Sequence, residues 1–371
     1  MGNSVKYSRM AAIGAAMMTV QLTAAYAAGV NVPQSAQQAK MPWGEFKLAP
    51  RIVASLKDGK PANVTVDVMA TAIPRMGTEM RAGMERGCAS SAGGLAMNCN
   101  LVGPINTDPN QQLSQLETLL ASESVDCLVL QTPLPGQFVR VIDKYIDQGI
   151  PVFTFNIDVD KSKRFAFTAL NEEEAGRING VETAKMVKAK NLSIDTVALA
   201  SSAPDQAWAR SRMKGFVAGY KEIIPQAKFF NDPARAVPTG LSYSVKETLT
   251  TMTPFLTAHP DVNLVFHTDQ SVEGVGEVIR NLKLQGKVYT SGFNVSRGIL
   301  SSIIDGVTLV TIDQNYAAQT NAGVKQCAAF LSKGEVPADP INFIPPVVIS
   351  KDGADGSLKA DAALKDLQSS K

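Results

Sequence analysis

The sequence has few of the residues that metal binding and common catalytic motifs require. Its 371 residues include only two histidines, His259 and His267, and its four cysteines match no zinc or haem spacing. A G-x-S-x-G nucleophile segment is missing, and "GVGEVI" at residues 274–279 falls inside an expected helix instead of at a strand–helix turn. We therefore expect no metal, no cofactor and no enzyme activity. The alternative, an exported glycosidase or esterase, would depend on the neighbouring carboxylates of Asp158 and Asp160.

Long apolar runs are also scarce, and the single candidate lies at the N-terminus. The run "MAAIGAAMMTVQLTAA" follows Lys6 and Arg9 and precedes the small residues Ala25 and Ala27. This order predicts a secretory signal peptide over residues 1–27, cleaved near Ala27. A membrane anchor is the alternative, but the run is short and contains polar residues. We therefore expect the mature protein in the periplasm.

The mature chain lacks an excess of either charge. The first 27 residues hold two basic and no acidic side chains, so their removal lowers the formal net charge from +2 to zero. A balanced charge gives no reason to expect binding to nucleic acid or to an anionic membrane.

The cysteines are too few for a disulfide scaffold, but an exported protein can form disulfides. Cys88 and Cys99 flank a loop of small residues, and this spacing favours a bridge between them. Cys127 lies in the apolar run "VDCLVLQT", and Cys327 lies on an apolar helix face. We expect the last two cysteines to be buried thiols and not ligands.

Strand-like and helix-like segments alternate along most of the chain, starting with "NVTVDVMAT" at residues 63–71. Such alternation predicts parallel sheets with helices on both faces. About eleven strands are too many for one doubly wound sheet, so we expect two lobes. Residues 28–61 form an N-terminal extension that begins with an unstructured lead. Residues 351–371 form a loose polar tail.

Polar side chains follow several of the apolar strand-like runs. "PVFTF" is followed by Asn156 and Asp158, and three further runs end in the same way, at Asp269, Asn294 and Gln314. Such residues are often only turn formers and helix caps. However, ligands of open parallel sheets bind beyond the carboxyl ends of the strands. Carboxylates and amides at four strand ends therefore favour a shared cleft for a sugar or polyol.

The chain resembles the periplasmic sugar-binding proteins of ABC importers, of the type I, ribose-binding class. The resemblance covers most of residues 63–349 and depends on "IPVFTFNID", "FTALNEEEAGRINGVETAKMV", "WARSRMKGF" and "TSGFNVSRGILSSIIDGVTLVTIDQNYAAQTNAGV". It implies two α/β lobes joined at a three-strand hinge. The N-terminal lobe would comprise residues 62–168 and 315–343, and the C-terminal lobe residues 169–314 and 344–350.

The resemblance also implies which residues bind the ligand. Arg75 stands near the place of the family's aromatic clamps, and Trp208 either stacks on a sugar ring or packs between helices. The other implied positions are Asn156, Asp158, Arg210, Tyr243, Asp269, Asn294 and Gln314. Asn replaces the family's Asp at positions 156 and 294, so the site has fewer carboxylates and the sugar is not identified.

The resemblance implies a binding protein and not an enzyme. Its partners would be a monosaccharide or polyol and the membrane subunits of an ABC permease. Alternatively, the same fold delivers a small signal molecule to a chemoreceptor or kinase. The sequence does not separate these two roles.

Overall fold

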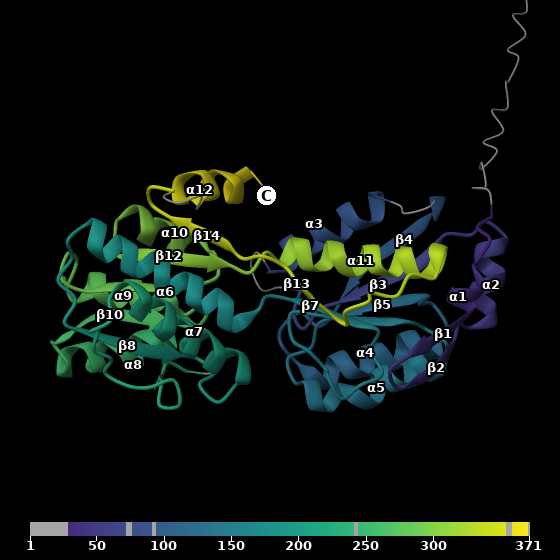
Figure 1. Cartoon of the computed structure of the whole chain (residues 1–371), viewed down its shortest axis with the longest axis horizontal. Coiled ribbons are helices and arrows are strands. Elements are labelled where there is room, and N and C mark those ends of the chain that lie inside the picture. The colour runs from purple at the N-terminus through teal and green to yellow at the C-terminus, as the bar shows by residue number, and fades with distance from the viewer. Residues whose placement is uncertain (1–28, 72–75, 91–93, 241–243, 354–357, 370–371) are drawn as a thin grey trace, which may run out of the picture.

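Two β-sheets form the centres of two lobes, and helices cover them (Figure 1). The computed structural model describes residues 29–71, 76–90, 94–240, 244–353 and 358–369. Within these residues, every helix is too short or too polar to pass through a lipid bilayer.

The N-terminal lobe contains a six-stranded sheet in the order β4-β3-β5-β6-β7-β13, in which all neighbours are parallel. Every residue of β5, β6 and β7 is buried, because helices lie on both faces of the sheet (Figure 1). The strands are β3 (Ala62–Asp67), β4 (Met97–Val102), β5 (Cys127–Leu130), β6 (Val152–Phe155), β7 (Ala166–Ala169) and β13 (Ile341–Phe343). The helices are α3 (Met76–Ala89), α4 (Pro109–Ala121), α5 (Pro135–Asp147) and α11 (Tyr316–Lys333).

The C-terminal lobe contains a seven-stranded sheet in the order β15-β14-β12-β11-β10-β8-β9, which is parallel except for the antiparallel pair β12–β14. The strands are β8 (Thr196–Ser201), β9 (Val237–Pro238), β10 (Val262–His267), β11 (Tyr289–Phe293), β12 (Thr308–Asp313), β14 (Val347–Ser350) and β15 (Leu358–Lys359). The helices are α6 (Glu172–Ala189), α7 (Ala207–Ile223), α8 (Val245–Ala258), α9 (Val272–Asn281), α10 (Arg297–Ile304) and α12 (Ala360–Ser369).

Alternate residues of β8 show why this second sheet is buried on both sides. Val197 and Leu199 pack in the apolar core that contains residues of α6 and α7. Ala198 and Ala200 belong to a separate core with residues of α8 and α9. Successive side chains of a strand point to opposite faces, so an apolar run without alternation requires cover on both.

The chain passes between the two sheets three times, between β7 and α6, between β12 and α11, and between β13 and β14. These three connections are short and lie next to the lobe boundaries predicted after residues 168, 314 and 343. The fold is the predicted α/β arrangement of two doubly wound sheets joined by three hinge segments.

The prediction of an unstructured lead at the start of residues 28–61 was wrong. Residues 29–61 contain α1 (Gln34–Gln37), a hairpin of β1 (Gln38–Met41) and β2 (Gly44–Lys47), and α2 (Pro50–Lys57). These elements lie at the end of the N-terminal lobe that is farther from the C-terminal lobe (Figure 1). The Phe46 ring is buried, with its centroid 4.9 Å from that of Phe165 and 5.8 Å from that of Phe330. The hairpin therefore completes the apolar core of this lobe.

The prediction of a loose polar tail was also wrong. β15 pairs with β14, and α12 buries Ala360 and Ala363 against the core that contains residues of α10. Leu364 and Leu367 pack against the same core. These four residues follow a helical spacing, which the many polar residues of the segment had obscured.

All four cysteines are paired. The predicted Cys88–Cys99 disulfide is present, with Cα atoms 6.1 Å apart. The expectation of buried thiols at Cys127 and Cys327 was wrong, because these residues form a second disulfide with Cα atoms 5.9 Å apart. This bridge joins β5 to α11, which pack face to face although 200 residues separate them in the sequence.

Candidate functional site

The side chain of Gln314 connects polar groups of the two lobes. Gln314 lies on the second hinge segment and is 4% exposed. Its Oε1 accepts hydrogen bonds from Asn156 Nδ2 (3.3 Å) and Arg212 Nη2 (2.8 Å), and its Nε2 donates to Asn294 Oδ1 (2.5 Å) and Tyr316 Oη (2.8 Å). A primary amide accepts two bonds and donates two, so these contacts use its whole capacity. We call these five residues the interlobe cluster.

The two asparagines of the interlobe cluster occupy equivalent places in the two lobes. Asn156 follows β6 and Asn294 follows β11, with φ angles of 65° and 72°. Their backbone N–H groups bond to carbonyls of Thr168 (2.9 Å) and Ile312 (2.7 Å) on or beside the next strand. Asn tolerates the left-handed conformation better than most residues. Each strand can therefore end in a sharp turn that aims an amide toward the hinge.

Arg212 supplies the positive charge of the interlobe cluster. Its guanidinium carbon lies 4.2 Å from the ring centroid of Phe293 and 4.9 Å from that of Trp208, and its side chain is 3% exposed. Nε donates to Glu172 Oε2 (2.6 Å), and Nη1 donates to the Thr268 carbonyl (2.9 Å). A buried charge needs such partners, which also hold the guanidinium plane in one orientation.

Arg210, the arginine implied by the resemblance, does not lie in this cluster. Its side chain is 53% exposed and donates to the carbonyls of Pro204 (3.3 Å) and Asp205 (2.9 Å) before its own helix. Positions two apart on a helix point about 200° apart, so only one of the two arginines can face the core. Arg212 shares the buried face of α7 with Phe216 and Tyr220, a spacing that could have identified it from the sequence.

Asp269 is buried beside the interlobe cluster but is bound by its own lobe. Its carboxylate accepts from Ser202 N and Oγ (both 3.1 Å), Thr268 Oγ1 (3.1 Å) and Ser271 N (3.0 Å). Burial alone would raise the pKa of this carboxyl, but the neighbouring His267 ring and these donors hold the pKa below its usual range. Asp269 is therefore ionised, and its oxygens are already engaged by protein donors.

His267, beneath Asp269, is arranged as a structural residue. Burial lowers the pKa of its imidazole, so the ring is neutral. Nδ1 accepts from Asp269 N (3.2 Å), which leaves the Nε2 proton to donate to Thr239 Oγ1 (2.8 Å). Ser202 Oγ contacts Asp269, Thr239 and Ser271 instead of the imidazole. These groups therefore do not form a serine nucleophile with a histidine base.

Of the remaining predicted site residues, Trp208 lies against the interlobe cluster, whereas Asp158 is paired outside it. Asp158 forms a two-point ion pair with Arg164, whose Nη2 lies 2.6 Å from Asp158 Oδ2. Trp208 contacts Arg212 through its ring, as described above. Arg75 and Tyr243 lie outside the described residues.

A chain of buried polar side chains behind Asn156 was missed at the sequence level. Gln131 Nε2 donates to Asn156 Oδ1 (2.8 Å), and Gln112 Nε2 donates to both the Gln131 carbonyl (2.7 Å) and Asp67 Oδ1 (2.5 Å). Burial raises the pKa of Asp67 to about 8, although its bond from Gln112 acts in the opposite direction. Gln131 follows the apolar run of β5, so the strand-end pattern could have identified it.

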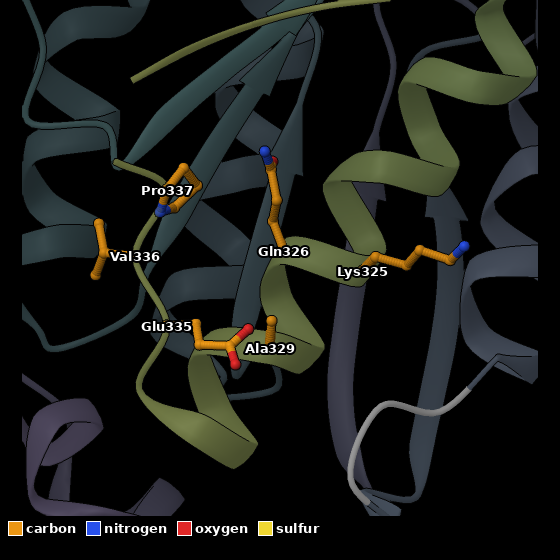
Figure 2. A pocket seen from close by; sticks show the side chains of 6 residues that line it. All are labelled: Lys325, Gln326, Ala329, Glu335, Val336 and Pro337. Atoms are coloured by element: carbon orange, nitrogen blue, oxygen red, sulfur yellow. The ribbon is translucent and has the colours of Figure 1, made fainter. Parts of the chain in front are cut away.

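A separate depression of about 440 Å³ lies on the N-terminal lobe, and no residue of the interlobe cluster lines it. It lies between α11 and the segment that follows it, and Figure 2 shows the Lys325 side chain extending away from those of Gln326 and Glu335. Its residue Gln326 accepts a hydrogen bond from Thr168 Oγ1 at 3.5 Å. We assign no role to this depression.

Comparison with known proteins agrees with this architecture. Residues 69–335 match the model of the periplasmic binding protein domain family. The chain belongs to this family. The match covers both lobes and all five residues of the interlobe cluster.

Solved structures of similar proteins have the same fold. A glucose-galactose binding protein, GanP, from Geobacillus stearothermophilus is 22% identical, with a TM-score of 0.64 over 80% of this chain and 99% of that one. The arabinose binding protein AraP from the same species is 20% identical, with a TM-score of 0.67 over 80% of this chain and 100% of that one. An ABC transporter solute binding protein from Burkholderia graminis, in complex with D-arabinose, is 20% identical, with a TM-score of 0.66 over 80% and 98%.

Proposed function

We propose that this protein is the periplasmic solute-binding component of an ABC importer and captures a monosaccharide or polyol between its lobes. The observation that carries this proposal is the hydrogen bonding of Gln314 to Asn156 of one lobe and to Arg212 and Asn294 of the other. The similar proteins described as binding glucose-galactose and arabinose support the choice of ligand.

Ligand binding would act by closing the two lobes about the hinge. A ligand shifts an open–closed equilibrium only by the difference between its affinities for the two forms. Groups that belong to different lobes give such a difference, because all of them reach the ligand only in the closed form. The closed form is then the one that docks on the permease.

Export to the periplasm fits the covalent structure. Both disulfides require an oxidising compartment to persist, and the periplasm is one. The signal peptide proposed for residues 1–27 would direct this export; it lies outside the described residues.

A thermal-shift screen of neutral sugars, polyols and sugar acids against the mature protein tests this proposal. A ligand present at 100 times its dissociation constant should add about 2.7 kcal/mol to the free energy of unfolding. Arg212→Ala should abolish the shift, because it removes the buried guanidinium that binds Gln314 and Thr268. Arg210→Ala, on the exposed side of the same helix, should respond like the wild type. A shift that survives Arg212→Ala and disappears in Arg210→Ala would refute the site.

A further inference from the structure

The amide of Gln314 has only one orientation that satisfies its neighbours. Arg212 has no acceptor atom, so the Gln314 atom that faces Nη2 at 2.8 Å must be the carbonyl oxygen. The Nε2 hydrogens then point to Asn294 and Tyr316. Because Asn294 accepts that bond through Oδ1, its Nδ2 group is left as a donor, and it has no acceptor among the described residues.

The amide of Asn156 is oriented by a second donor-only group, in the other lobe. The backbone N–H of Met69 donates to Gln131 Oε1 at 3.4 Å, which turns Gln131 Nε2 toward Asn156. Asn156 therefore accepts through Oδ1 and presents its Nδ2 hydrogens. Its contact with Gln314 Oε1, at 3.3 Å, is long, and the second Nδ2 hydrogen has no acceptor among the described residues.

The charged groups of the site, like the two asparagines, have more unused donors than unused acceptors. Arg212 has five N–H groups, and its hydrogen bonds to Glu172, Thr268 and Gln314 use three of them among the described residues. Both oxygens of Asp269 already accept bonds from Ser202 and its neighbours. Within the part of the chain that the structure describes, the unused hydrogen-bonding capacity of the interlobe cluster consists mainly of N–H donors.

We infer that the ligand presents a carboxylate to Asn156, Asn294 and Arg212, and therefore that it is a sugar acid, such as a uronate or aldonate, and not a neutral sugar. This inference rests on the proposed function and narrows its ligand class. A hydroxyl group brings a hydrogen that needs an acceptor, whereas a carboxylate only accepts and can take bonds from several N–H groups. A neutral sugar would leave some hydroxyl hydrogens or some of these amide donors without partners, which weakens binding.

Calorimetric titration with matched pairs of ligands tests the inference. The pairs are D-galactose with D-galacturonate and D-glucose with D-glucuronate and D-gluconate. We expect at least one acid to bind at least tenfold more tightly than its neutral parent. Neutral sugars that bind as tightly as their acids, or more tightly, would overturn the inference and leave the proposed function in place. If no member of the panel binds but another neutral sugar or a polyol of the thermal-shift screen does, the inference fails and the proposed function stands; if nothing in that screen binds either, both fail.

The substitution Asn294→Asp tests whether the Nδ2 group of Asn294 donates a hydrogen bond to the ligand. The aspartate keeps an oxygen for the bond from Gln314 Nε2 and tolerates the positive φ of 72°, but it replaces the Nδ2 donor by a negatively charged acceptor. We expect it to weaken binding of the acid at least tenfold and to weaken the neutral parent less. An unchanged preference for the acid in Asn294→Asp would overturn the assigned role of Asn294.

Asn191→Asp is the matched control for this change. Asn191 also has a positive φ, of 48°, but it is exposed at the end of α6 and far from the hinge segments in the sequence. It adds the same negative charge to the same lobe. We expect it to keep the wild-type affinities. If instead both variants bind the acid more weakly by the same factor, added negative charge alone explains the loss, and the inference is overturned.

Discussion

Each lobe buries an aspartate at the carboxyl end of a strand, Asp67 as the last residue of β3 and Asp269 two residues after β10, but the protonation of the two is controlled in opposite ways. Asp67 receives one side-chain bond, from Gln112, and burial raises the pKa of its carboxyl to about 8. Asp269 receives bonds from Ser202, Thr268 and Ser271, and the pKa of its carboxyl is held below its usual range. Both carboxyls are fully buried, so the His267 ring beside Asp269 and the larger number of donors around it, and not burial, make the difference in charge.

The atoms without partners support this difference. Asp67 Oδ2 and Gln112 Oε1 are buried and have no hydrogen-bond partner among the described residues. Both are acceptors when Asp67 is ionised, whereas a proton on Asp67 supplies a donor. We therefore expect Asp67 to carry its proton at neutral pH in the folded protein.

The lobes also differ in how they are stabilised. All four cysteines belong to the N-terminal lobe, where they form two disulfides. The C-terminal lobe has none and instead packs hydroxyl groups around Asp269 and His267. Each lobe contains one tryptophan, Trp43 or Trp208, so Trp43→Phe and Trp208→Phe backgrounds give a fluorescent probe of one lobe at a time.

The largest expected effect is the loss of the disulfide between β5 and α11. Replacing Cys127 and Cys327 by Ala should lower the free energy of unfolding of the N-terminal lobe by about 5 kcal/mol, because the bridge closes a loop of 200 residues. Replacing Cys88 and Cys99, which close a loop of 11 residues, should lower it by about 3 kcal/mol. Urea unfolding followed through Trp43 measures both, and equal losses would contradict the loop-length argument.

A smaller effect is expected from Asp269→Asn. The amide nitrogen would face the donors Ser202 and Ser271, so the C-terminal lobe should lose about 3 kcal/mol at pH 7, as measured by urea unfolding through Trp208. The folded pKa of Asp269 is lowered, so its contribution is present above about pH 4 and disappears as the pH falls through the folded pKa. Asp305→Asn, at an exposed site of the same lobe, should change little. A loss of the same size in both variants would argue against the role of the buried donors.

Asp67→Asn should change the pH dependence of stability in the sense opposite to Asp269→Asn, and its effect on the free energy of unfolding should be the smallest of the three. Because the folded pKa is raised, the wild type is most stable below about pH 4 and loses stability as the pH rises toward 8. Relative to Asp67→Asn, the wild type should lose about 2.7 kcal/mol between pH 5 and pH 7, or about 1.4 kcal/mol per pH unit. Urea unfolding through Trp43 at pH 5, 6 and 7 measures this, and parallel profiles for the two proteins would rule out a neutral Asp67.

The sequence by itself determined the features that depend on neighbouring residues. The alternation of strands and helices predicted two parallel sheets, and polar residues after apolar runs identified Asn156, Asn294 and Gln314, which the structure joins by hydrogen bonds. The short loop between Cys88 and Cys99 favoured their disulfide. These signals are local, because strand period, turn chemistry and loop length act over a few residues.

Only the tertiary structure decided which distant or adjacent residues meet. Cys127 and Cys327 pair because α11 packs on β5 after the chain has crossed to the other lobe and returned, and no local pattern indicates that contact. Arg212 and not Arg210 reaches Gln314 because α7 presents one face to the hinge. The charge of Asp67 and of Asp269 likewise depends on donors from other strands and helices. Local sequence specifies an aspartate at a strand end, whereas packing decides whether enough donors surround it to keep it ionised.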